Sequence, residues 1–290
     1  MVFRDGERFV RCACGQRHWG SYGAAGLLVT DPGRGVLLQR RAWWTHQGGT
    51  WGVPGGALRS GEAPLDAARR EAREEAAVPP DLLMPTASST VDHGTWRYTT
   101  VLATVRAQLR ATVSDVESAE LRWVPPDEVA ALRLHPGFAE AWPTLADELD
   151  RALVLVVDAA NVMGSRPDGW WRDRAGAAAR LRDGLAGLAA AGVPDSGIGL
   201  LGRRPGWTWW PRIVLVVEGQ ARGVSTVDGV TVVAAPRDGD AEIVAQARRL
   251  VEERPYDHVL VATADRELRD RITAEGADPM SPRTLLSLLG

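Results

Sequence analysis

Three glutamates, Glu71, Glu74 and Glu75, lie in a stretch from Ala63 to Ala77 that predicts a helix ended by Pro79-Pro80. At 100° per residue their carboxylates fall within about a 100° arc, and Glu71 and Glu75 are one turn apart. Carboxylates crowded in this way repel one another unless a cation lies among them. Oxygen ligands suit Mg²⁺ or Mn²⁺, which can bridge phosphate oxygens. The spacing therefore indicates metal-dependent phosphate chemistry.

The residues around these glutamates support that chemistry but also allow a simpler interpretation. Gly55-Gly56, before the helix, lets the backbone approach a metal and phosphates closely. Glu62 and Arg70 could pair and hold the preceding loop against the helix. However, interleaved arginines (Arg69, Arg70 and Arg73) are equally typical of a solvated, salt-bridged helix. Spacing alone leaves both interpretations open.

The segment from Gly56 to Val78 resembles the Nudix box, G-x5-E-x7-R-E-U-x-E-E-x-G-U. The matching positions are Gly56, Glu62, Arg70, Glu71, Glu74, Glu75 and Val78. The segment departs at Ala77, where the box has glycine, and at Ala72, where a larger aliphatic residue is usual; neither position carries chemistry. The resemblance implies an α/β/α Nudix fold with a mixed sheet over residues 20–150. It also implies hydrolysis of nucleoside diphosphates linked to another group.

The resemblance assigns roles position by position. Glu74 and Glu75 would bind Mg²⁺ (or Mn²⁺) with help from the carbonyl of Gly55. Glu71 would be the base that activates water, and Arg70 would orient Glu71. Hydrolysis of a pyrophosphate link needs neutralised phosphate charge and an activated water, and such a set supplies both.

Flanking segments resemble the MutT-like branch of the family, namely Trp51-Gly-Val-Pro-Gly-Gly and Glu120-Leu-Arg-Trp123-Val. In that branch a late acidic residue completes the metal site, so Glu120 is the expected ligand and Glu117 the runner-up. Gly56, Trp51 and His46 are expected at the nucleotide. The wider set that could form a stacking pocket is Trp43, Trp44, His46, Gln47, Trp51 and the segment 93–98. Each of these could instead serve packing alone.

A second group of polar residues follows predicted strands in the C-terminal half. Asp158 and Asn161 come after an aliphatic run, Asp240 lies at the start of a helix, and Asp265 follows another apolar strand. Sites in open α/β sheets gather at the carboxyl ends of strands. Each aspartate could also be a helix N-cap. Together they indicate a Mg²⁺ or Mn²⁺ cluster.

These motifs resemble the NYN branch of the PIN-like nucleases (YacP-like) over residues 151–290. The matching motifs are the D-x-x-N opening at Asp158 and Asn161, the acidic helix start at Asp240, and the ending from Thr263 to Leu268. The family commonly has two adjacent acids at the middle motif, whereas Ala241 follows Asp240 here. The resemblance implies a PIN-like α/β domain with a mainly parallel sheet that is either a metal-dependent ribonuclease or a module that binds single-stranded RNA.

Two smaller signals remain. Cys12, Cys14 and His18 invite a zinc interpretation, but a structural site usually has four ligands and only three are apparent. An ordinary reduced turn is the alternative. Trp207, Trp209 and Trp210, near Arg203 and Arg204, could stack on single-stranded nucleic acid or could pack in a loop.

The elements that must position these residues divide into two halves near Asp150, after a short N-terminal extension (residues 1–19). In the first half the predicted strands and helices are Ala24–Thr30, Gly35–Arg40, Ala63–Ala77, Tyr98–Arg106, Leu121–Val124 and His135–Arg151. In the second half they alternate as strand and helix: Ala152–Asp158, Ala175–Ala191, Ile213–Val217, Val230–Ala234, Ala241–Glu253, His258–Thr263 and Arg266–Glu275.

The amino-acid composition limits which classes of protein and which chemistry fit these motifs. The 290 residues are 45% hydrophobic and 24% charged, as in globular proteins. All 34 basic residues are arginine, which excludes Schiff-base lysine chemistry and a P-loop lysine. With two cysteines, no export signal and no membrane span expected, we expect a bacterial cytoplasmic enzyme that hydrolyses nucleotide pyrophosphates. The alternative is a nucleotide sensor that controls the second domain. Oligomeric state is left open.

Overall fold

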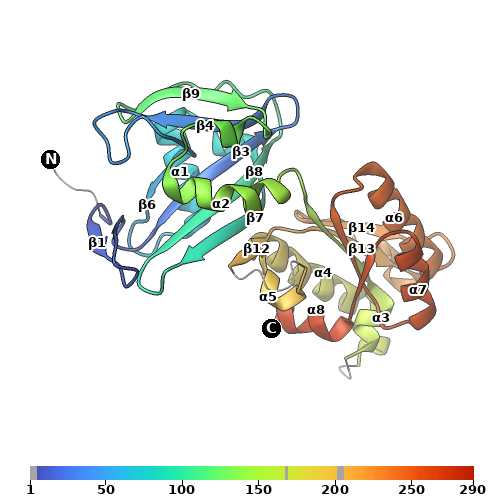
Figure 1. Ribbon diagram of the computed structural model, residues 1–290. Coiled ribbons are helices and arrows are strands. Elements are labelled where there is room, and N and C mark those ends of the chain that lie inside the picture. The colour runs from blue at the N-terminus through green and yellow to red at the C-terminus, as the bar shows by residue number, and fades with distance from the viewer. Residues whose placement is uncertain (1–4, 167–168, 201–205) are drawn as a thin grey trace. The chain divides into compact units, whose positions relative to one another are not determined.

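The computed structural model describes residues 5–166, 169–200 and 206–290, and it separates into two compact units, Met1–Asp150 and Arg151–Gly290. In the described chain, none of the helices has the length and apolar character that a membrane span requires. Figure 1 shows the elements of each unit.

Unit 1 is built on a mixed sheet. Its strands are β1 (Phe9–Arg11), β2 (Arg17–Trp19), β3 (Ala24–Asp31), β4 (Gly35–Arg41), β5 (Trp51–Gly52), β6 (Gly55–Ala57), β7 (Leu83–Asp92), β8 (Arg97–Val105) and β9 (Ser118–Val124). Neighbouring strands run β7-β8-β3-β4-β5, while β6 pairs with β3 and β9 pairs with β4. The β3–β8 pair is parallel and the others are antiparallel.

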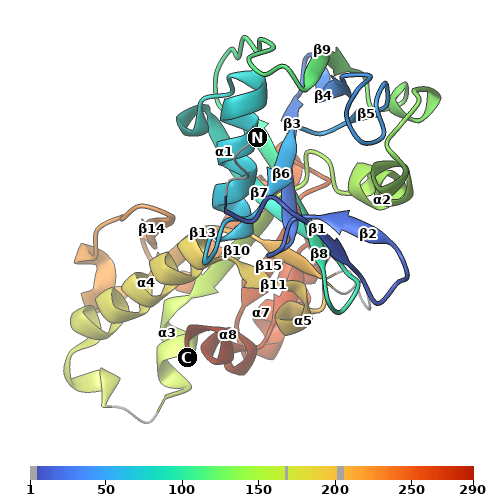
Figure 2. The same ribbon diagram turned by 90° about the vertical axis from the view of Figure 1, so that its left-hand side faces the viewer.

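Two helices cover this sheet, α1 (Pro64–Ala76) and α2 (Pro136–Asp147). Figure 2 shows them on opposite sides of it. The face of α1 turned to the sheet carries fully buried alanines, Ala67, Ala68, Ala72 and Ala76. These small side chains let the helix lie close to β3, and this accounts for Ala72 where the box has a larger residue.

Unit 2 has a parallel sheet. Its elements are β10 (Leu153–Asp158), α3 (Ala159–Gly164), α4 (Arg174–Ala191), β11 (Val193–Pro194), α5 (Asp195–Ile198), β12 (Trp207–Trp209), β13 (Arg212–Val217), β14 (Val230–Ala234), α6 (Gly239–Glu253), β15 (His258–Ala262), α7 (Arg266–Ala274), β16 (Asp278–Met280) and α8 (Pro282–Leu289). The strand order is β14-β13-β10-β15-β16, with every pair parallel. Helices α6 and α7 lie on one side of the sheet and α4 and α8 on the other (Figure 1).

The strand order of unit 2 places β10 at a switch point. The chain moves outward from β10 through β13 and β14, and then returns to the other side of β10 to form β15 and β16. The connections therefore diverge at the carboxyl end of β10, and a crevice opens there. A core of aliphatic residues from β10, β13 and β15, including Val156, Val216 and Val261, packs beneath α6 and α7.

The predicted helices and strands largely coincide with these bounds, but they did not include β5, β6, α3, β11, α5, β12, β16 and α8, and three further differences stand out. Strand β7 was missed because Pro85 and small polar residues obscure its alternation, and the register shifts between Pro85 and Ala87. The closing helix ends at Asp147 rather than Arg151, and Asp150 has a φ of 59°, which no α-helix tolerates. The residues treated as an extension contain an antiparallel hairpin, β1–β2.

Candidate functional site

The carboxylates of α1 lie directly over the glycine strand β6. A Cβ on Gly56 would come within 2.5 Å of Glu71 Oε1, and one on Gly55 within 2.5 Å of the Ala25 carbonyl oxygen. Neither position can hold a side chain without displacing its neighbours. Pairing of β6 with β3 fixes the strand at this distance from the helix. Glycine is therefore required at both positions because β6 lies too close to Glu71 and to the Ala25 carbonyl for a side chain to fit.

Glu75 is the buried member of the set. Its side chain is 7% exposed, and Oε2 accepts the Gly55 N–H at 2.8 Å. Burial raises the pKa of Glu75 to about 8, with the Gly55 hydrogen bond opposing and the Glu71 charge adding to the rise. In the protein alone, ionised Glu75 is thus disfavoured near neutral pH. A cation beside it would restore the charged form.

Glu71 is held by a guanidinium. Arg70 donates from Nη1 to Glu71 and forms a two-pronged pair with Glu62, from Nε and Nη2, each at 2.8 Å. Its Nη2 also donates to the Ala57 carbonyl at 3.0 Å. Burial raises the pKa of Glu71, and the Arg70 hydrogen bond opposes that rise. Arg70 therefore fixes Glu71 relative to both the loop and β6, as the pairing of Glu62 with Arg70 predicted.

The donor set fits a hard divalent cation, since it consists of carboxylate oxygens around one buried acid. Glu74 is more exposed than Glu71 and Glu75, and its Oε1 lies 3.6 Å from an Arg59 nitrogen. Within the described residues, no three carboxylates here have oxygens all within 4.8 Å of one another. Helix α1 thus directs Glu71, Glu74 and Glu75 toward one region, but their oxygens are not close enough together to form a complete set of metal ligands.

Glu120 does not join this group. It pairs directly across the sheet with Arg40, so both side chains lie on the same face. Its carboxylate forms ion pairs with Arg40 at 3.1 Å and with Arg122 at 2.7 Å. Gln39 and Arg41, which act on Glu75, flank Arg40 and so project from the opposite face. The expectation of Glu120 as a metal ligand is therefore wrong in this structure. Glu117 is exposed and directly precedes β9, whose register with β4 shifts between Arg40 and Arg41.

The predicted nucleotide contacts separate into two kinds. Trp51 is 6% exposed, and the guanidiniums of Arg122 and Arg40 lie 4.8 and 5.8 Å from its ring centre, so it serves packing rather than open stacking. His46 is exposed in the loop between β4 and β5. The same loop exposes two tryptophans, Trp43 at 82% and Trp44 at 58%. Exposed aromatic rings suit stacking on a base.

Sequence reasoning missed Gln39 and Arg41. The Gln39 amide hydrogen-bonds Glu75 and lowers its pKa, while Oε1 of this buried side chain has no hydrogen-bond partner in the described chain. Arg41 exerts its charge on Glu75 and on His135, whose pKa burial lowers. The signal was available, because alternate residues of a strand share a face. A positive charge here suits phosphate binding.

In unit 2, Asp158 and Asn161 connect two strand ends. Asp158 is 7% exposed; its Oδ1 accepts the Asn161 N–H at 3.0 Å and its Oδ2 the Thr263 hydroxyl at 3.0 Å. The Asn161 side-chain oxygen accepts the Ala264 N–H at 2.8 Å. Thus the end of β10 and the start of α3 are tied to the residues after β15, as the shared sheet edge predicted.

Acidic residues surround the cavity above this edge. It has a volume of about 120 Å³, and its polar lining residues are Asp158, Asn161, Glu218, Asp240 and Asp265. Burial raises the pKa of Asp158, with Asp240 and Glu218 adding to the rise. Burial also raises the pKa of Asp240, with the charges of Asp238 and Asp265 adding to it. The predicted acids therefore share one cavity and repel one another, although no three have oxygens all within 4.8 Å.

Two of these acids are also N-caps. Asp158 caps α3 and Asp265 caps α7, whereas α6 is capped by Asp238, which leaves Asp240 in the first turn. Sequence reasoning missed Glu218, which directly follows β13, the strand next to β10, whose last residue is Asp158. Its Oε2 accepts the Gly239 N–H at 3.1 Å.

The tryptophan patch is not a free stacking surface. Trp207 and Trp209 are buried with stacked rings, 5.7 Å between centres, and Trp209 Nε1 donates to Asp195 at 3.1 Å. Arg203 and Arg204 lie outside the described residues. The nucleic-acid interpretation of Trp207 and Trp209 is therefore wrong, and packing explains them.

Comparisons with known proteins find a family model and relatives that are similar to part of this chain. The NUDIX domain model matches residues 21–146. "Putative 8-oxo-dGTP diphosphatase 3" of Mycobacterium tuberculosis is 49% identical over 155 residues, which is 50% of this chain and 71% of that protein. A "Nucleoside triphosphate pyrophosphatase/Nudix hydrolase fusion protein" of Bifidobacterium longum is 42% identical over 157 residues, 51% of this chain. The match spans only 33% of that longer relative. The crystal structure of the M. smegmatis Nudix hydrolase RenU is 47% identical, with 48% of this chain and 92% of that chain covered and a TM-score of 0.44.

Proposed function

Because the chain belongs to the Nudix family, we propose that unit 1 is a divalent-metal-dependent hydrolase that cleaves a pyrophosphate bond of a nucleoside triphosphate or a related nucleoside diphosphate derivative. The observation that carries this proposal is the arrangement of α1 over β6. In this arrangement Glu75 is buried and Glu71 is held in place by Arg70. Gly55 and Gly56 have no side chains, so the backbone of β6 is accessible beside both glutamates.

Glu74 and Glu75 would hold Mg²⁺ (or Mn²⁺), with the Gly55 carbonyl as a further donor. When bound, the cation supplies positive charge to the phosphate oxygens. Arg41 places a second positive charge near Glu75.

Glu71 is the proposed base. Its raised pKa makes it a better proton acceptor than an ordinary glutamate, and Arg70 holds its carboxylate over Gly56. A water proton passes to Glu71 as the water oxygen bonds to phosphorus. The bridging P–O bond then breaks, and its electron pair stays on the leaving phosphate oxygen. A nucleoside triphosphate would thus give a monophosphate and pyrophosphate.

The relatives suggest where to look for the substrate. One is named a putative 8-oxo-dGTP diphosphatase and another a nucleoside triphosphate pyrophosphatase fused to a Nudix hydrolase. We propose purine nucleoside triphosphates, including 8-oxo-dGTP, as the first class to test. Exposed Trp43 and Trp44, with His46 beside them, supply rings for a base.

The test is hydrolysis of a panel of nucleotides with Mg²⁺, with products identified by chromatography. Glu74→Gln and Glu75→Gln should nearly abolish turnover, and Glu71→Gln should lower kcat by roughly 10²–10⁴-fold with little change in substrate affinity. Asp66→Asn is the matched control, since Asp66 lies on α1 but is exposed in the first turn. Tight nucleotide binding without any turnover would instead support the sensor function.

For unit 2 we propose a PIN-like domain of the NYN branch that binds single-stranded RNA and cleaves it with Mg²⁺ or Mn²⁺. The supporting observation is the acidic cavity at the switch point, with Asp158, Asp240 and Asp265 at its lining. Ala241 stands where the family commonly has a second acid, and Glu218 supplies an acid from another strand. Asp158→Asn should abolish Mn²⁺-dependent RNA cleavage and leave nucleotide hydrolysis unchanged. If the unmodified chain binds RNA but does not cleave it, the nuclease proposal is wrong and unit 2 is an RNA-binding module.

A further inference from the structure

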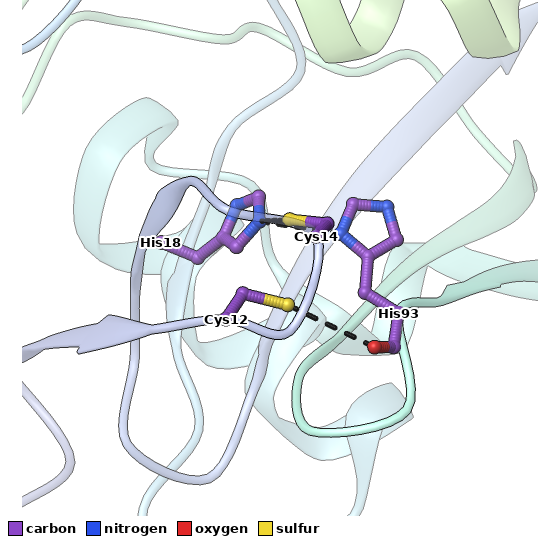
Figure 3. A group of neighbouring side chains, drawn as sticks. All are labelled: Cys12, Cys14, His18 and His93. Atoms are coloured by element: carbon purple, nitrogen blue, oxygen red, sulfur yellow. Dashed lines mark hydrogen bonds between the residues drawn. The ribbon is translucent and has the colours of Figure 1, made fainter.

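Four potential metal ligands meet in unit 1 away from the carboxylates of α1. Ligand atoms of Cys12, Cys14, His18 and His93 all lie within 4.8 Å of one another. Figure 3 shows the two cysteines and His18 on the N-terminal hairpin, with His93 approaching from the turn between β7 and β8. The fourth ligand that the sequence lacked near Cys12 therefore comes from 75 residues beyond His18.

Local structure presents the two sulfurs on one side of a tight turn. The Gly15 N–H donates to the Cys12 carbonyl at 3.0 Å, and Gly15 has a φ of 85°, which favours glycine. The Cys12 N–H donates to Gln16 at 2.9 Å, which closes the turn before β2 begins. His18, in the middle of β2, then faces Cys14, with 3.1 Å between Nε2 and Sγ.

The turn that carries His93 is fastened to the hairpin by other contacts. Thr95 accepts the Ala13 N–H at 3.2 Å and donates its hydroxyl to Cys12 Sγ at 3.4 Å. The Trp96 ring stacks on His18, with centres 4.0 Å apart and planes 10° from parallel. A hydroxyl that donates to a sulfur and a ring that fixes a histidine are the kind of supporting contacts that hold metal ligands in place.

Two of the ligand distances fall just below those of a tetrahedral zinc site, so these atoms need to move apart by only a few tenths of an ångström to hold the ion. Zinc at its usual bond lengths would hold neighbouring sulfur and nitrogen ligands about 3.3–3.8 Å apart. His18 Nε2 lies 3.1 Å from Cys14 Sγ and 3.2 Å from His93 Nδ1. A neutral ring nitrogen offers either one proton or one lone pair, so hydrogen bonding alone satisfies these two contacts poorly. A cation between the atoms satisfies all of the lone pairs.

We propose that Cys12, Cys14, His18 and His93 form a structural Zn²⁺ site. Two thiolates and two imidazoles in a tetrahedral arrangement select zinc over Mg²⁺, which prefers oxygen. All four positions are filled by the protein, so the site leaves no place for a reacting water and its role is structural.

The site would fix an element that is weak alone. A two-stranded hairpin such as β1–β2 is marginally stable without further support. The N-terminal segment that contains this hairpin contacts loops of the proposed nucleotide site at two points. Asp5 accepts the Ser60 N–H at 2.9 Å, in the loop before α1, and the Phe9 ring meets His46 at 5.8 Å. Zinc at Cys12 and His93 would hold the hairpin, and through it these loops, against the sheet.

The test begins with the full chain, purified without a histidine tag and without chelator, and measures bound metals by mass spectrometry. We expect about one zinc per chain, as a single closed site requires. Cys14→Ser and His93→Ala should each lose that zinc. His135→Gln, a histidine outside the cluster, and Glu75→Gln, in the carboxylate site, should both keep it. Replacement of zinc by Co²⁺ should give the visible bands and thiolate charge-transfer absorption of a tetrahedral cobalt thiolate centre.

The test does not depend on whether the variants fold. Titration of Co²⁺ into the chelator-treated unmodified chain detects metal binding at the site directly, through the thiolate absorption. Chelation should also lower the Tm and increase hydrogen exchange in residues 9–19, and added zinc should reverse both. The proposal fails if the unmodified chain holds no zinc and Co²⁺ gives no thiolate absorption. It also fails if zinc is present but survives both Cys14→Ser and His93→Ala, because the metal then lies elsewhere.

Discussion

Glu75 links the stability of unit 1 to its proposed metal. The side chain is buried and its pKa is raised to about 8 from an ordinary 4.5. Because the unfolded chain loses this proton near pH 4.5 and the folded chain holds it to about pH 8, the folded state binds more protons between these values. Stability must therefore fall as pH rises through this window, with no penalty below it.

The size of this effect follows from the same values. At 1.36 kcal/mol per pKa unit, and with Glu75 half ionised at pH 8, the metal-free protein should lose about 4 kcal/mol of stability between pH 4 and pH 8 from this group. Glu75→Gln keeps an oxygen for the Gly55 N–H but cannot ionise. The variant should thus be more stable than the unmodified chain at pH 8 by about that amount, while it loses nucleotide hydrolysis.

The assay compares both proteins in chelator at several pH values. Hydrogen exchange of peptides from α1 reports on unit 1 alone, which matters because two units need not unfold together. Glu71, Asp158 and Asp240 also have raised pKa values, but they are present in both proteins, so the difference isolates Glu75. Added Mg²⁺ should flatten the dependence on pH in the unmodified chain only. Equal slopes in the two proteins would refute the argument.

Three further predictions concern neighbouring positions. Gly56→Ala should lower kcat in nucleotide hydrolysis assays, because the new Cβ would lie 2.5 Å from Glu71 Oε1 and displace that carboxylate; unchanged kcat would contradict the close approach. Ala77→Gly should stabilise unit 1 by about 1 kcal/mol, since Ala77 ends α1 with a φ of 52°, and denaturant unfolding followed by exchange in α1 measures it. Glu120→Gln should leave the Mg²⁺ dependence of activity unchanged, because its partners are Arg40 and Arg122; a large rise in the Mg²⁺ requirement would restore it as a ligand.

Local patterns were enough to predict the helix of the first site and its charged face. The spacing of Glu71, Glu74 and Glu75 within one helix fixes their relative directions, because backbone hydrogen bonds set the helical geometry. The aliphatic run before Asp158 likewise predicted a buried strand and a polar residue at its end. Such features depend on residues close in the chain, and the observed helix and strand bounds follow them closely.

Contacts between distant segments were decided only by the tertiary structure. The bulge between Arg40 and Arg41 sets which residues of β9 face α1, and a shift of one residue reverses every side chain. That register turned Glu120 away from Glu75. The order of parallel strands brought Glu218 to Asp158, and the β7–β8 turn brought His93 to Cys12. Neither contact produces a recognisable residue spacing in the sequence. Loop lengths and sheet order, rather than local backbone geometry, determine which strand ends lie together.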